Sequence, residues 1–453
     1  MNTPQEVLHI CKVLRENGHE AWLVGGAVRD AMLGREAHDW DVATSAHPES
    51  VVKLFPRVIE TGIKHGTVTV LHHGQSYEVT TYRGDGAYSD GRRPDDVKFL
   101  KTIEEDLARR DFTVNAIAYD PIGDRFCDPY DGEHDLWNNT IRAVGDPYKR
   151  FAEDGLRVLR AARFASTLEF EVEAQTLAAI RGSLDTLAKV SIERVHDEWL
   201  KAMGARDPSV AFNIMAETGM LMVIAPELLP MLGCEQNRYH AFDVWQHTMA
   251  VVNSCPPSDP ILRMAALLHD IGKPVTRAFH TAKSDYTFYD HEITGAAMAN
   301  EFMARMRFSL RERERVTHLV RHHFIRYETG GDWSDSAVRR WVRRVGPEHV
   351  ESLFTLARAD IAGKGPAPAA DTKLECGAID ELQARIAELS KSAVTSTKAL
   401  CINGTDVLQR LGCAPGPVVG RMLAALLEKV LDDPSLNTRE SLLELVDALG
   451  PSV

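Results

Sequence analysis

The stretch LVGGAVRDAMLGREAHDWD, residues 23–41, combines a glycine pair with two carboxylates that are separated by one residue. Side chains at positions i and i+2 of a strand point to the same face of a sheet, so a strand through Trp40 would direct Asp39 and Asp41 at one point. Two carboxylates at one point repel each other unless a cation lies between them. Mg²⁺ prefers oxygen ligands and is often held by one or two carboxylates together with substrate phosphates. We therefore predict a Mg²⁺ site at Asp39 and Asp41.

The glycine pair, Gly25 and Gly26, precedes a predicted helix over residues 27–33 that carries Arg29. Glycine allows a backbone to approach a phosphate closely, and the amides at a helix start favour an anion. An isolated D-x-D usually marks a solvated strand end or turn, and a glycine pair alone is a weaker signal. The combination of both is more specific, and it predicts that a triphosphate and a metal ion meet in one place.

The composition is that of a soluble globular protein with several domains. The chain has 453 residues, of which 44% are hydrophobic and 26% are charged. We see no apolar run near twenty residues and no signal peptide, so we expect neither a membrane span nor secretion. The cysteines include no C-x-x-C pair, which favours reduced thiols in a cytoplasmic protein.

The net charge of −13 argues against a general affinity for nucleic acid. It leaves room for local basic tracks, because phosphate contacts need only a few well-placed Arg and Lys side chains. Such clusters are present at Arg109–Arg110, at Arg157, Arg160 and Arg163, and at Arg339–Arg344. An acidic chain with local basic stripes fits a chosen RNA substrate.

Residues 67–71 and 76–82 alternate in polarity and predict two strands joined by a turn. Glu78 on the second strand is either a third carboxylate near the metal or a solvent-facing residue, and we slightly favour the latter. Residues 83–97, RGDGAYSDGRRPDDV, predict a loop because they are rich in glycine, aspartate and proline.

The segment FAEDGLRVLRAARF, residues 151–164, predicts one helix in which Asp154 and Arg157 share a face. An intrahelical ion pair is one interpretation of that spacing. The other is recognition of a nucleobase: a carboxylate accepts from the exocyclic amine of C or A, and an arginine donates to ring acceptors. Such a pair would select C and A over U and G.

Imidazoles and carboxylates also recur in the middle of the chain. They lie in WQHTMAVV, AALLHDIGK, DHEITGAAMA, LVRHHF and ARADIAGKG, within residues 236–365. A histidine on an apolar helix is more often a core residue than a ligand, but an adjacent His-Asp pair with further histidines favours a metal site. Imidazole suits Ni, Zn or Fe, and carboxylate suits Mg or Mn.

GG-x-x-R-D followed by D-x-D, then RRDFTVNAIA and E-D-x-x-R, resembles the class II tRNA nucleotidyltransferases, that is, the CCA-adding enzymes and related poly(A) polymerases. The resemblance implies a polymerase β-like head, Mg²⁺, the substrates CTP and ATP, and tRNA as partner. It implies that Glu153 and Asp154 belong to a nucleotide template and that the 83–97 loop helps the enzyme to change from CTP to ATP. Nucleotide-binding candidates beside the glycines and Arg29 are Arg110, Asp111, Asn115, Asp154, Arg157, Arg160 and Arg163.

The second constellation resembles the HD phosphohydrolase superfamily. That resemblance implies a divalent metal such as Mg, Mn or Ni, held by His247, His269, Asp270 and Asp360. It also implies further ligands or phosphate contacts at His291 and His322, and a phosphate contact at Lys273. The implied activity is a phosphatase or 2′,3′-cyclic phosphodiesterase on RNA ends or nucleotides.

We predict an α+β protein, with a mixed-sheet head followed by an almost entirely helical remainder. The predicted domains are a catalytic head, a helical neck and body, an HD domain, and a helical tRNA-binding tail; they span residues 1–145, 146–232, 233–365 and 366–453. Three functions stay open beside CCA addition: an enzyme that adds only A, a poly(A) polymerase, and an HD phosphohydrolase whose head only clamps RNA. An RNA-binding scaffold without activity is disfavoured because two complete sets of candidate ligands are present.

Overall fold

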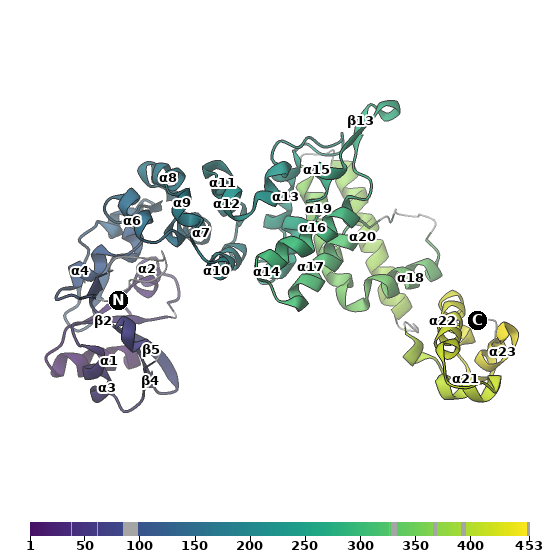
Figure 1. The fold of residues 1–453 in the computed structure, drawn as a ribbon, viewed down its shortest axis with the longest axis horizontal. Helices are drawn as coiled ribbons and strands as arrows, with labels where there is room; N and C mark the ends of the chain where they lie inside the picture. Colours follow the sequence, from purple (N-terminus) through teal and green to yellow (C-terminus); the bar gives the residue numbers. More distant parts are fainter. Residues whose placement is uncertain are drawn as a thin grey trace. The chain divides into compact units, whose positions relative to one another are not determined.

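The chain divides into two compact units, one of residues 1–229 with 305–307 and one of residues 230–304 with 308–453. Figure 1 shows the fold in a computed structural model. None of the helices it describes is both long enough and apolar enough to cross a bilayer. The structure describes residues 1–37, 39–60, 62–84, 98–325, 327, 333–365, 369–390 and 396–450.

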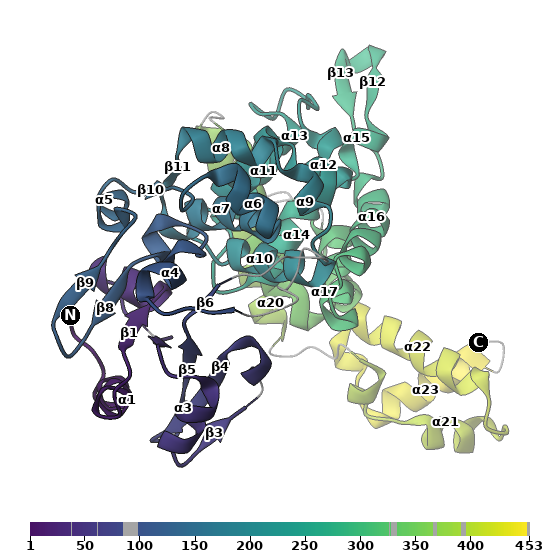
Figure 2. The same cartoon turned by 60° about the vertical axis from the view of Figure 1, so that its left-hand side comes forward.

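The first unit is built on a mixed sheet with the strand order β3-β4-β5-β2-β1-β8-β9. The strand β2 is antiparallel to β1 and parallel to β5, so the sheet reverses direction next to the D-x-D segment. Figure 2 shows β1, β8 and β9 side by side along one part of this sheet. The strands are β1 Ala21–Val24, β2 Asp41–Thr44, β3 Val58–Ile59, β4 Thr67–His72, β5 Gln75–Thr81, β8 Ala118–Asp120 and β9 Arg125–Cys127.

Helices around this sheet follow the apolar spacing of the sequence. The first, α1, buries Val7, Ile10, Cys11 and Leu14 on one face. A capping box at Thr102 begins α4, where its side chain and that of Glu105 satisfy each other's backbone amides. The helices are α1 Gln5–Glu16, α2 Gly26–Met32, α3 Pro48–Leu54, α4 Ile103–Ala108 and α5 Gly132–Trp137, with a 3₁₀ turn η2 Thr113–Asn115.

Two short ribbons complete the head. The strand β6, Arg83–Gly84, pairs with β7, Lys98–Phe99, in antiparallel fashion. Residues 85–97 of the predicted loop lie outside the described residues. The strand β10, Thr140–Ile141, pairs in parallel with β11, Glu171–Val172.

The single helix predicted over residues 151–164 is wrong. The helix α6 ends at Glu153, Asp154 adopts an extended conformation, and α7 begins at Leu156. A Cβ on Gly155 would lie 2.2 Å from the carbonyl oxygen of Thr186. The backbone of a neighbouring segment therefore comes so close that only glycine fits at this break. The two helices are α6 Pro147–Glu153 and α7 Leu156–Leu168.

The rest of the first unit is helical, as predicted. Trp199 is fully buried and packs edge-on against Phe212, which ties α10 to α11. The elements are α8 Ala174–Arg181, α9 Leu184–Leu187, α10 Ile192–Met203, α11 Ser209–Thr218, α12 Met220–Ile224 and η3 Pro226–Met231.

The second unit is almost entirely helical, apart from one small hairpin of β12 and β13. The predicted fold class, a mixed-sheet head with a largely helical remainder, is confirmed; the division into four domains stays a prediction. Its elements are α13 Val244–Ser254, α14 Pro260–Leu268, α15 Lys273–Thr276, β12 Ala278–His280, β13 Asp285–Thr287, α16 His291–Arg305, α17 Leu310–His322, α18 Asp335–Val345, α19 Val350–Gly363, α20 Ala369–Ser390, α21 Gly404–Leu411, α22 Pro417–Asp432 and α23 Arg439–Leu449.

The basic stretch in α18 does not form the open phosphate track that its sequence suggested. Arg340 pairs with Glu428 and Asp432 of α22, and Arg343 also pairs with Glu428. Arg339 is buried and donates to the carbonyl oxygen of Leu431 at 2.9 Å. These arginines therefore attach the C-terminal helices to α18.

Candidate functional site

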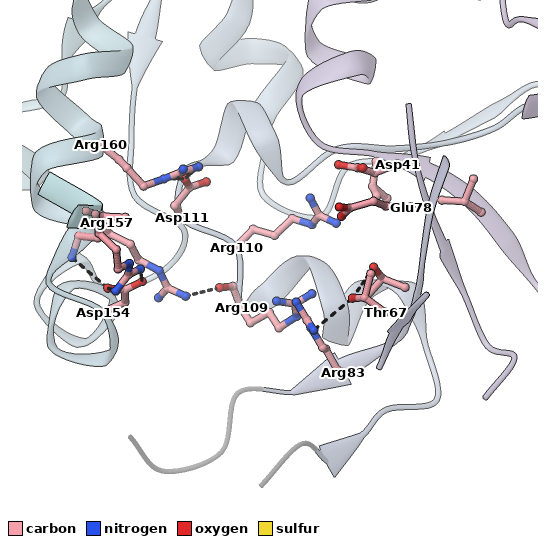
Figure 3. A pocket seen from close by; sticks show the side chains of 15 residues that line it. Asp41, Thr67, Glu78, Arg83, Arg109, Arg110, Asp111, Asp154, Arg157 and Arg160 are labelled. Carbon is pink, nitrogen blue, oxygen red and sulfur yellow. Dashed lines mark hydrogen bonds and ion pairs between the residues drawn. The ribbon is translucent and has the colours of Figure 1, made fainter. Parts of the chain in front are cut away.

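A cavity of about 330 Å³ opens in the first unit where the central strands face α6 and α7. Asp41 and Glu78 lie at its strand side, and arginines interspersed with Asp111 and Asp154 line the rest (Figure 3). Among the described residues, the charged ones that line it are Asp41, Glu78, Arg83, Arg109, Arg110, Asp111, Asp154, Arg157, Arg160 and Arg194.

Two carboxylates lie together at the strand side of the cavity. The parallel pairing of Val42 with Val79 places Asp41 next to Glu78 on the neighbouring strand, and both line the cavity. Burial raises the pKa of Asp41 to about 6, and the charge of Glu78 adds to this rise. Glu78 is exposed, but the surface it faces is the cavity, so it joins Asp41 as a candidate cation ligand.

Asp39 lies just outside this pair. The strand β2 begins at Asp41, so the predicted strand through Trp40 is wrong, and the buried Trp40 ring precedes the sheet. Asp39 is exposed and is not among the described residues that line the cavity. Its charge still raises the pKa of Asp41, so the two carboxylates are electrostatic neighbours.

The glycine pair leaves room between the carboxylates and the arginines. Gly25 has a φ of 78°, and a Cβ there would lie 3.2 Å from Arg110 Nη1 and 3.6 Å from Asp41 Oδ2. A side chain at Gly25 would therefore crowd both charged groups in an unfavourable backbone conformation. Gly26 follows as the first residue of α2.

Arg29 and Asn115 were both predicted to contact the nucleotide, and the structure joins them to each other. Arg29 is buried and donates to Asn115 Oδ1 at 2.7 Å and to Asp30 Oδ1 at 2.8 Å. Neither Arg29 nor Asn115 is among the described residues that line the cavity. Their pairing braces α2 against η2, below the cavity.

A buried carboxylate that sequence reasoning missed organises the arginine wall. Asp106 accepts from Arg109 Nε at 3.0 Å and from Arg110 Nη2 at 3.3 Å, and its side chain is 1% exposed. It also accepts from the backbone amide of Arg83 at 3.3 Å. Burial alone would raise the pKa of Asp106, but the two arginines lower it below its ordinary value, so the carboxylate is ionised.

The far end of the cavity contains the residues predicted to select the base. Asp154 does not share a helix face with Arg157; its carboxylate pairs with Arg194 of α10 through both oxygens, at 2.7 and 3.2 Å. Arg157 donates to Glu153 and, at 2.8 Å, to the carbonyl oxygen of Arg109. Arg194 carried no motif in the sequence, because only the fold brings α10 to this position.

Asp111 and Arg160 form a partly buried ion pair on the same wall. Arg160 Nε donates to Asp111 Oδ2 at 2.8 Å. Burial is the largest single contribution and acts to raise the pKa of Asp111, but the charge and hydrogen bond of Arg160, together with the hydrogen bonds from Asn115 and the Phe112 amide, lower it below its ordinary value. Arg163 lies behind this pair, against Glu198 and over the Phe164 ring, and is not among the described lining residues.

A second candidate site lies in the other unit, among α13, α14 and α19. His247 Nε2 is 3.2 Å from His269 Nε2 and 2.9 Å from Asp360 Oδ1. Both imidazoles are fully buried. Because ligand atoms of all three residues lie within 4.8 Å of one another, they could hold one metal ion.

Asp270 extends this site toward a second group of ligands. Its Oδ2 lies 3.1 Å from His269 Nε2, while its Oδ1 lies 3.6 Å from His291 Nε2 and 3.9 Å from His323 Nε2. Asp270, His291 and His323 therefore form a second compact set, and Asp270 faces both sets. His323 takes the position predicted for His322, which instead packs against His318 on the other side of α17.

The orientation of three imidazoles suits metal binding. The Nδ1 atoms of His269, His291 and His323 lie 2.7 to 2.8 Å from the carbonyl oxygens of Ala266, Phe288 and Val320. A carbonyl oxygen only accepts, so each Nδ1 carries a proton and each Nε2 faces the site, where its lone pair could bind a metal ion. Burial lowers the pKa of His323 to about 3, which keeps this ring neutral.

Three family profiles match consecutive parts of the chain. Residues 21–142 match the Poly A polymerase head domain, and residues 169–232 match the probable RNA and SrmB-binding site of polymerase A. Residues 238–362 match the HD domain. The strand side of the first cavity thus lies within the head profile, and the His/Asp set lies within the HD profile.

Relatives match along the whole chain. A CCA-adding enzyme of Levilactobacillus brevis is 32% identical over 437 residues, or 96% of each chain. One of Ligilactobacillus salivarius is 47% identical over 220 residues, an alignment that spans about half of either protein, 48% of this chain and 54% of the relative. The crystal structure of the Bacillus stearothermophilus CCA-adding enzyme in complex with CTP has a TM-score of 0.71 and 30% identity, covering 99% of this chain and 98% of that one.

Proposed function

The chain belongs to the family of CCA-adding enzymes, and from this premise we propose that it adds C, C and A to the 3′ end of tRNA from CTP and ATP. The observation that carries the proposal is the single cavity that joins Asp41 and Glu78 at one end to Asp154 and Arg157 at the other. A nucleoside triphosphate has the same two ends, a phosphate chain that needs cations and a base that needs a specific edge. The CTP in the crystal structure of the Bacillus stearothermophilus relative supports the same substrate class.

The residues at the strand end would handle the phosphates. The oxygen ligands of Asp41 and Glu78, with Asp39 beside them, fit Mg²⁺. Burial first, and then the charges of Glu78 and Asp39, raise the pKa of Asp41, and a bound cation would offset both effects. Bound there, Mg²⁺ would lower the pKa of the attacking 3′-hydroxyl and offset charge on the transferring phosphoryl group. Gly25 leaves room for the triphosphate, and Arg110 offers it a guanidinium. The 3′-hydroxyl attacks the α-phosphate in line, and pyrophosphate leaves.

The residues at the other end would choose the base without a nucleic-acid template. Asp154 is held by Arg194, which fixes the direction of its carboxylate toward the cavity. A carboxylate accepts a hydrogen bond from the exocyclic amine of C or A, which U and G lack at that edge. Arg157, seated by the carbonyl of Arg109, would donate to a ring acceptor. Asp111 and Arg160 would form the wall between the two ends.

The test supplies purified protein and Mg²⁺ with tRNAs that end at the discriminator base, at C, or at CC, and with CTP, ATP or both. Stepwise growth that stops at CCA is the expected result, and Asp41→Ala should prevent it. Addition of A only to the CC end would identify an A-adding enzyme, and unlimited growth with ATP would identify a poly(A) polymerase. No growth with any end would contradict the proposal.

The His/Asp set favours a second activity, a metal-dependent phosphohydrolase. The supporting observation is the convergence of imidazole Nε2 atoms and carboxylates on two adjacent positions, both of which Asp270 faces. This donor set fits divalent metals such as Mg, Mn or Ni. Such a metal would lower the pKa of a bound water molecule and make it a nucleophile for a phosphoester. Lys273, whose Nζ lies 2.7 Å from Asp270 Oδ2, would bind the phosphate of an RNA end or a nucleotide.

Release of phosphate from RNA with a 3′-phosphate, and opening of a 2′,3′-cyclic end, test this activity in Mg²⁺, Mn²⁺ and Ni²⁺. Loss of both reactions in Asp270→Ala, with nucleotide addition retained, would support it. Release that persists in that variant would show that another group or a contaminant is the source.

A further inference from the structure

One guanidinium in the head lies between two competing acidic neighbours. Arg110 pairs with Asp106 at 3.3 Å, and Figure 3 shows its side chain directed toward Asp41 and Glu78. A Cβ on Gly25 would lie 3.2 Å from Arg110 Nη1 and 3.6 Å from Asp41 Oδ2, so the guanidinium and the carboxylate flank the same glycine and their opposite charges attract each other. A cation bound by Asp41 and Glu78 would occupy the same acidic pocket that draws Arg110.

The buried carboxylate of Asp106 is the anchor that keeps Arg110 out of that pocket. Its side chain is 1% exposed, so water screens its charge little, and its Oδ2 faces Arg110 Nη2. Its Oδ1 accepts from Arg109 Nε and Nη2, at 3.0 and 2.9 Å, and from the backbone amide of Arg83. These contacts fix the position of the Asp106 carboxylate. The ion pair between Asp106 and Arg110 therefore restrains the Arg110 guanidinium beside that carboxylate.

The same anchor reaches the base-selecting end. The guanidinium of Arg109 is held by Asp106, and the backbone carbonyl oxygen of Arg109 accepts a hydrogen bond from Arg157 Nη2 at 2.8 Å. Asp106 therefore positions Arg110 beside the phosphate end of the cavity. Through Arg109, it also positions the backbone carbonyl that binds Arg157 at the base end.

We propose that Asp106 is a positioning residue that restrains Arg110, so that Asp41 and Glu78 remain available for the divalent cation of nucleotide transfer. The inference rests on the proposed nucleotidyltransferase function. Without the Asp106 charge, Arg110 would turn to Asp41 and Glu78, its nearest remaining acids in the cavity, and would compete with the cation for them.

Asp106→Asn keeps the shape of the side chain and removes its charge. We expect the Mg²⁺ concentration for half-maximal CTP addition to rise by about tenfold, the change that losing one charge-assisted contact produces in an equilibrium. Rates at saturating Mg²⁺ should recover more than rates at low Mg²⁺. A second readout is Mg²⁺-dependent binding of a CTP analogue with a non-cleavable α–β bridge, measured by calorimetry in chains that also carry Asp270→Ala to silence the His/Asp site.

The chain offers a matched control in Asp120 of β8. This carboxylate is also buried and also holds two arginines, Arg15 at 2.6 Å and Arg125 at 3.1 Å, but it does not line the cavity. Asp120→Asn should lower the thermal unfolding midpoint as Asp106→Asn does, and should leave the Mg²⁺ requirement unchanged.

The decisive variant combines Asp106→Asn with Arg110→Gln. If the defect comes from Arg110 moving onto Asp41 and Glu78, Asp106→Asn should raise the Mg²⁺ requirement no further in a chain that already carries Arg110→Gln, whatever Arg110→Gln alone loses in triphosphate binding. Losses that add, or a Mg²⁺ requirement unchanged in Asp106→Asn, would overturn the proposal. If Asp106→Asn alone does not fold, the double variant is compared with Arg110→Gln, because it removes one of the two guanidinium charges that pair with Asp106. A wild-type chain that adds no nucleotide would refute the proposed function instead.

Discussion

The two candidate sites hold their carboxylates in opposite ways. In the His/Asp site, burial is the largest single contribution and acts to raise the pKa of Asp270, but His269, Lys273 and His247 together lower it well below its ordinary value. In the head, burial and Glu78 raise the pKa of Asp41 to about 6. The first site already surrounds its carboxylate with positive or metal-binding groups, whereas the second leaves its carboxylate in need of a cation.

This difference in the surroundings of the two carboxylates indicates how each site would use a metal ion. In each of the two ligand sets of the His/Asp site, three ligand atoms lie within 4.8 Å of one another, so the site is preorganised for a resident ion. Among the described residues, the head carboxylates form no such compact group, and they border an open cavity of about 330 Å³ lined with arginines. That arrangement suits an ion that arrives with a triphosphate, since phosphate oxygens would complete its coordination.

The largest effect should come from Asp41→Asn. The change preserves shape but removes a charge at the point where a cation must bind, so we expect nucleotide addition to fall by about 10³-fold or more. Single-turnover incorporation of CTP measures this, with the exposed Glu217→Gln as control. Phosphate release by the His/Asp site should be unaffected; a loss of both activities would break the separation of the two sites.

Asp270→Asn should give the reverse pattern. Wild type should gain about 2.7 kcal/mol of unfolding free energy in Mn²⁺ or Ni²⁺ at 100 times the dissociation constant. The variant should gain almost none, because Asp270 faces both ligand sets. Thermal unfolding with and without metal gives the comparison, and CTP addition should stay within about twofold of wild type. Full metal stabilisation in the variant would remove Asp270 from the ligands.

Asp154→Ala should impair selection more than rate. We expect the preference for CTP over UTP to fall by about 10- to 100-fold, the value of one specific base contact of 1–3 kcal/mol. Steady-state kinetics with both nucleotides on a tRNA ending at the discriminator base would reveal the change. Arg163→Lys is the comparison, because Arg163 lies behind the cavity wall against Glu198. An equal loss of selectivity in both variants would mean that helix packing, not the Asp154 contact, selects the base.

The smallest effect concerns stability and pH. Because the pKa of Asp41 is raised to about 6 in the folded chain, the folded state binds more protons than the unfolded state between about pH 4 and 6. Its ionisation therefore costs stability as pH rises through this window, and the full cost remains above it. In EDTA at pH 7.5, Asp41→Asn should increase the free energy of unfolding by roughly 1 kcal/mol once solvent screening is included. This gain corresponds to a rise of about 2–4 °C in the unfolding midpoint.

Two controls sharpen the pH prediction. The gain from Asp41→Asn should shrink as pH falls from 6 to 4 and disappear below about pH 3, where Asp41 is protonated in both states. An equivalent variant at Asp270, whose pKa is lowered, should lose stability at pH 7.5. A gain from Asp41→Asn that does not depend on pH would reflect packing, not charge.

Sequence motifs located most of the head cavity because they join residues that are close along the chain. Gly25 with Asp41, and Arg110 with Asp111, lie within short segments whose local geometry places them together. Two lining residues that were missed or undervalued, Arg194 and Glu78, lie on separate elements, a helix and a strand, whereas the missed Asp106 lies close to Arg109 and Arg110 in the sequence but does not line the cavity. The sequence shows no spacing that links Arg194 or Glu78 to the motifs.

The amino-acid sequence by itself determined the fold class, the binary pattern of helices and strands, and the identity of most charged candidates. Tertiary structure decided which of these charges meet: Asp154 with Arg194, Arg29 with Asn115, and the α18 arginines with α22. It also decided that Gly155 breaks a helix whose periodicity continues across it, because the Thr186 backbone passes too close for a Cβ. The physical reason is the distance along the chain over which each signal acts. Hydrophobic periodicity reflects which face of a single element is buried, whereas an ion pair between distant residues depends on which elements pack together.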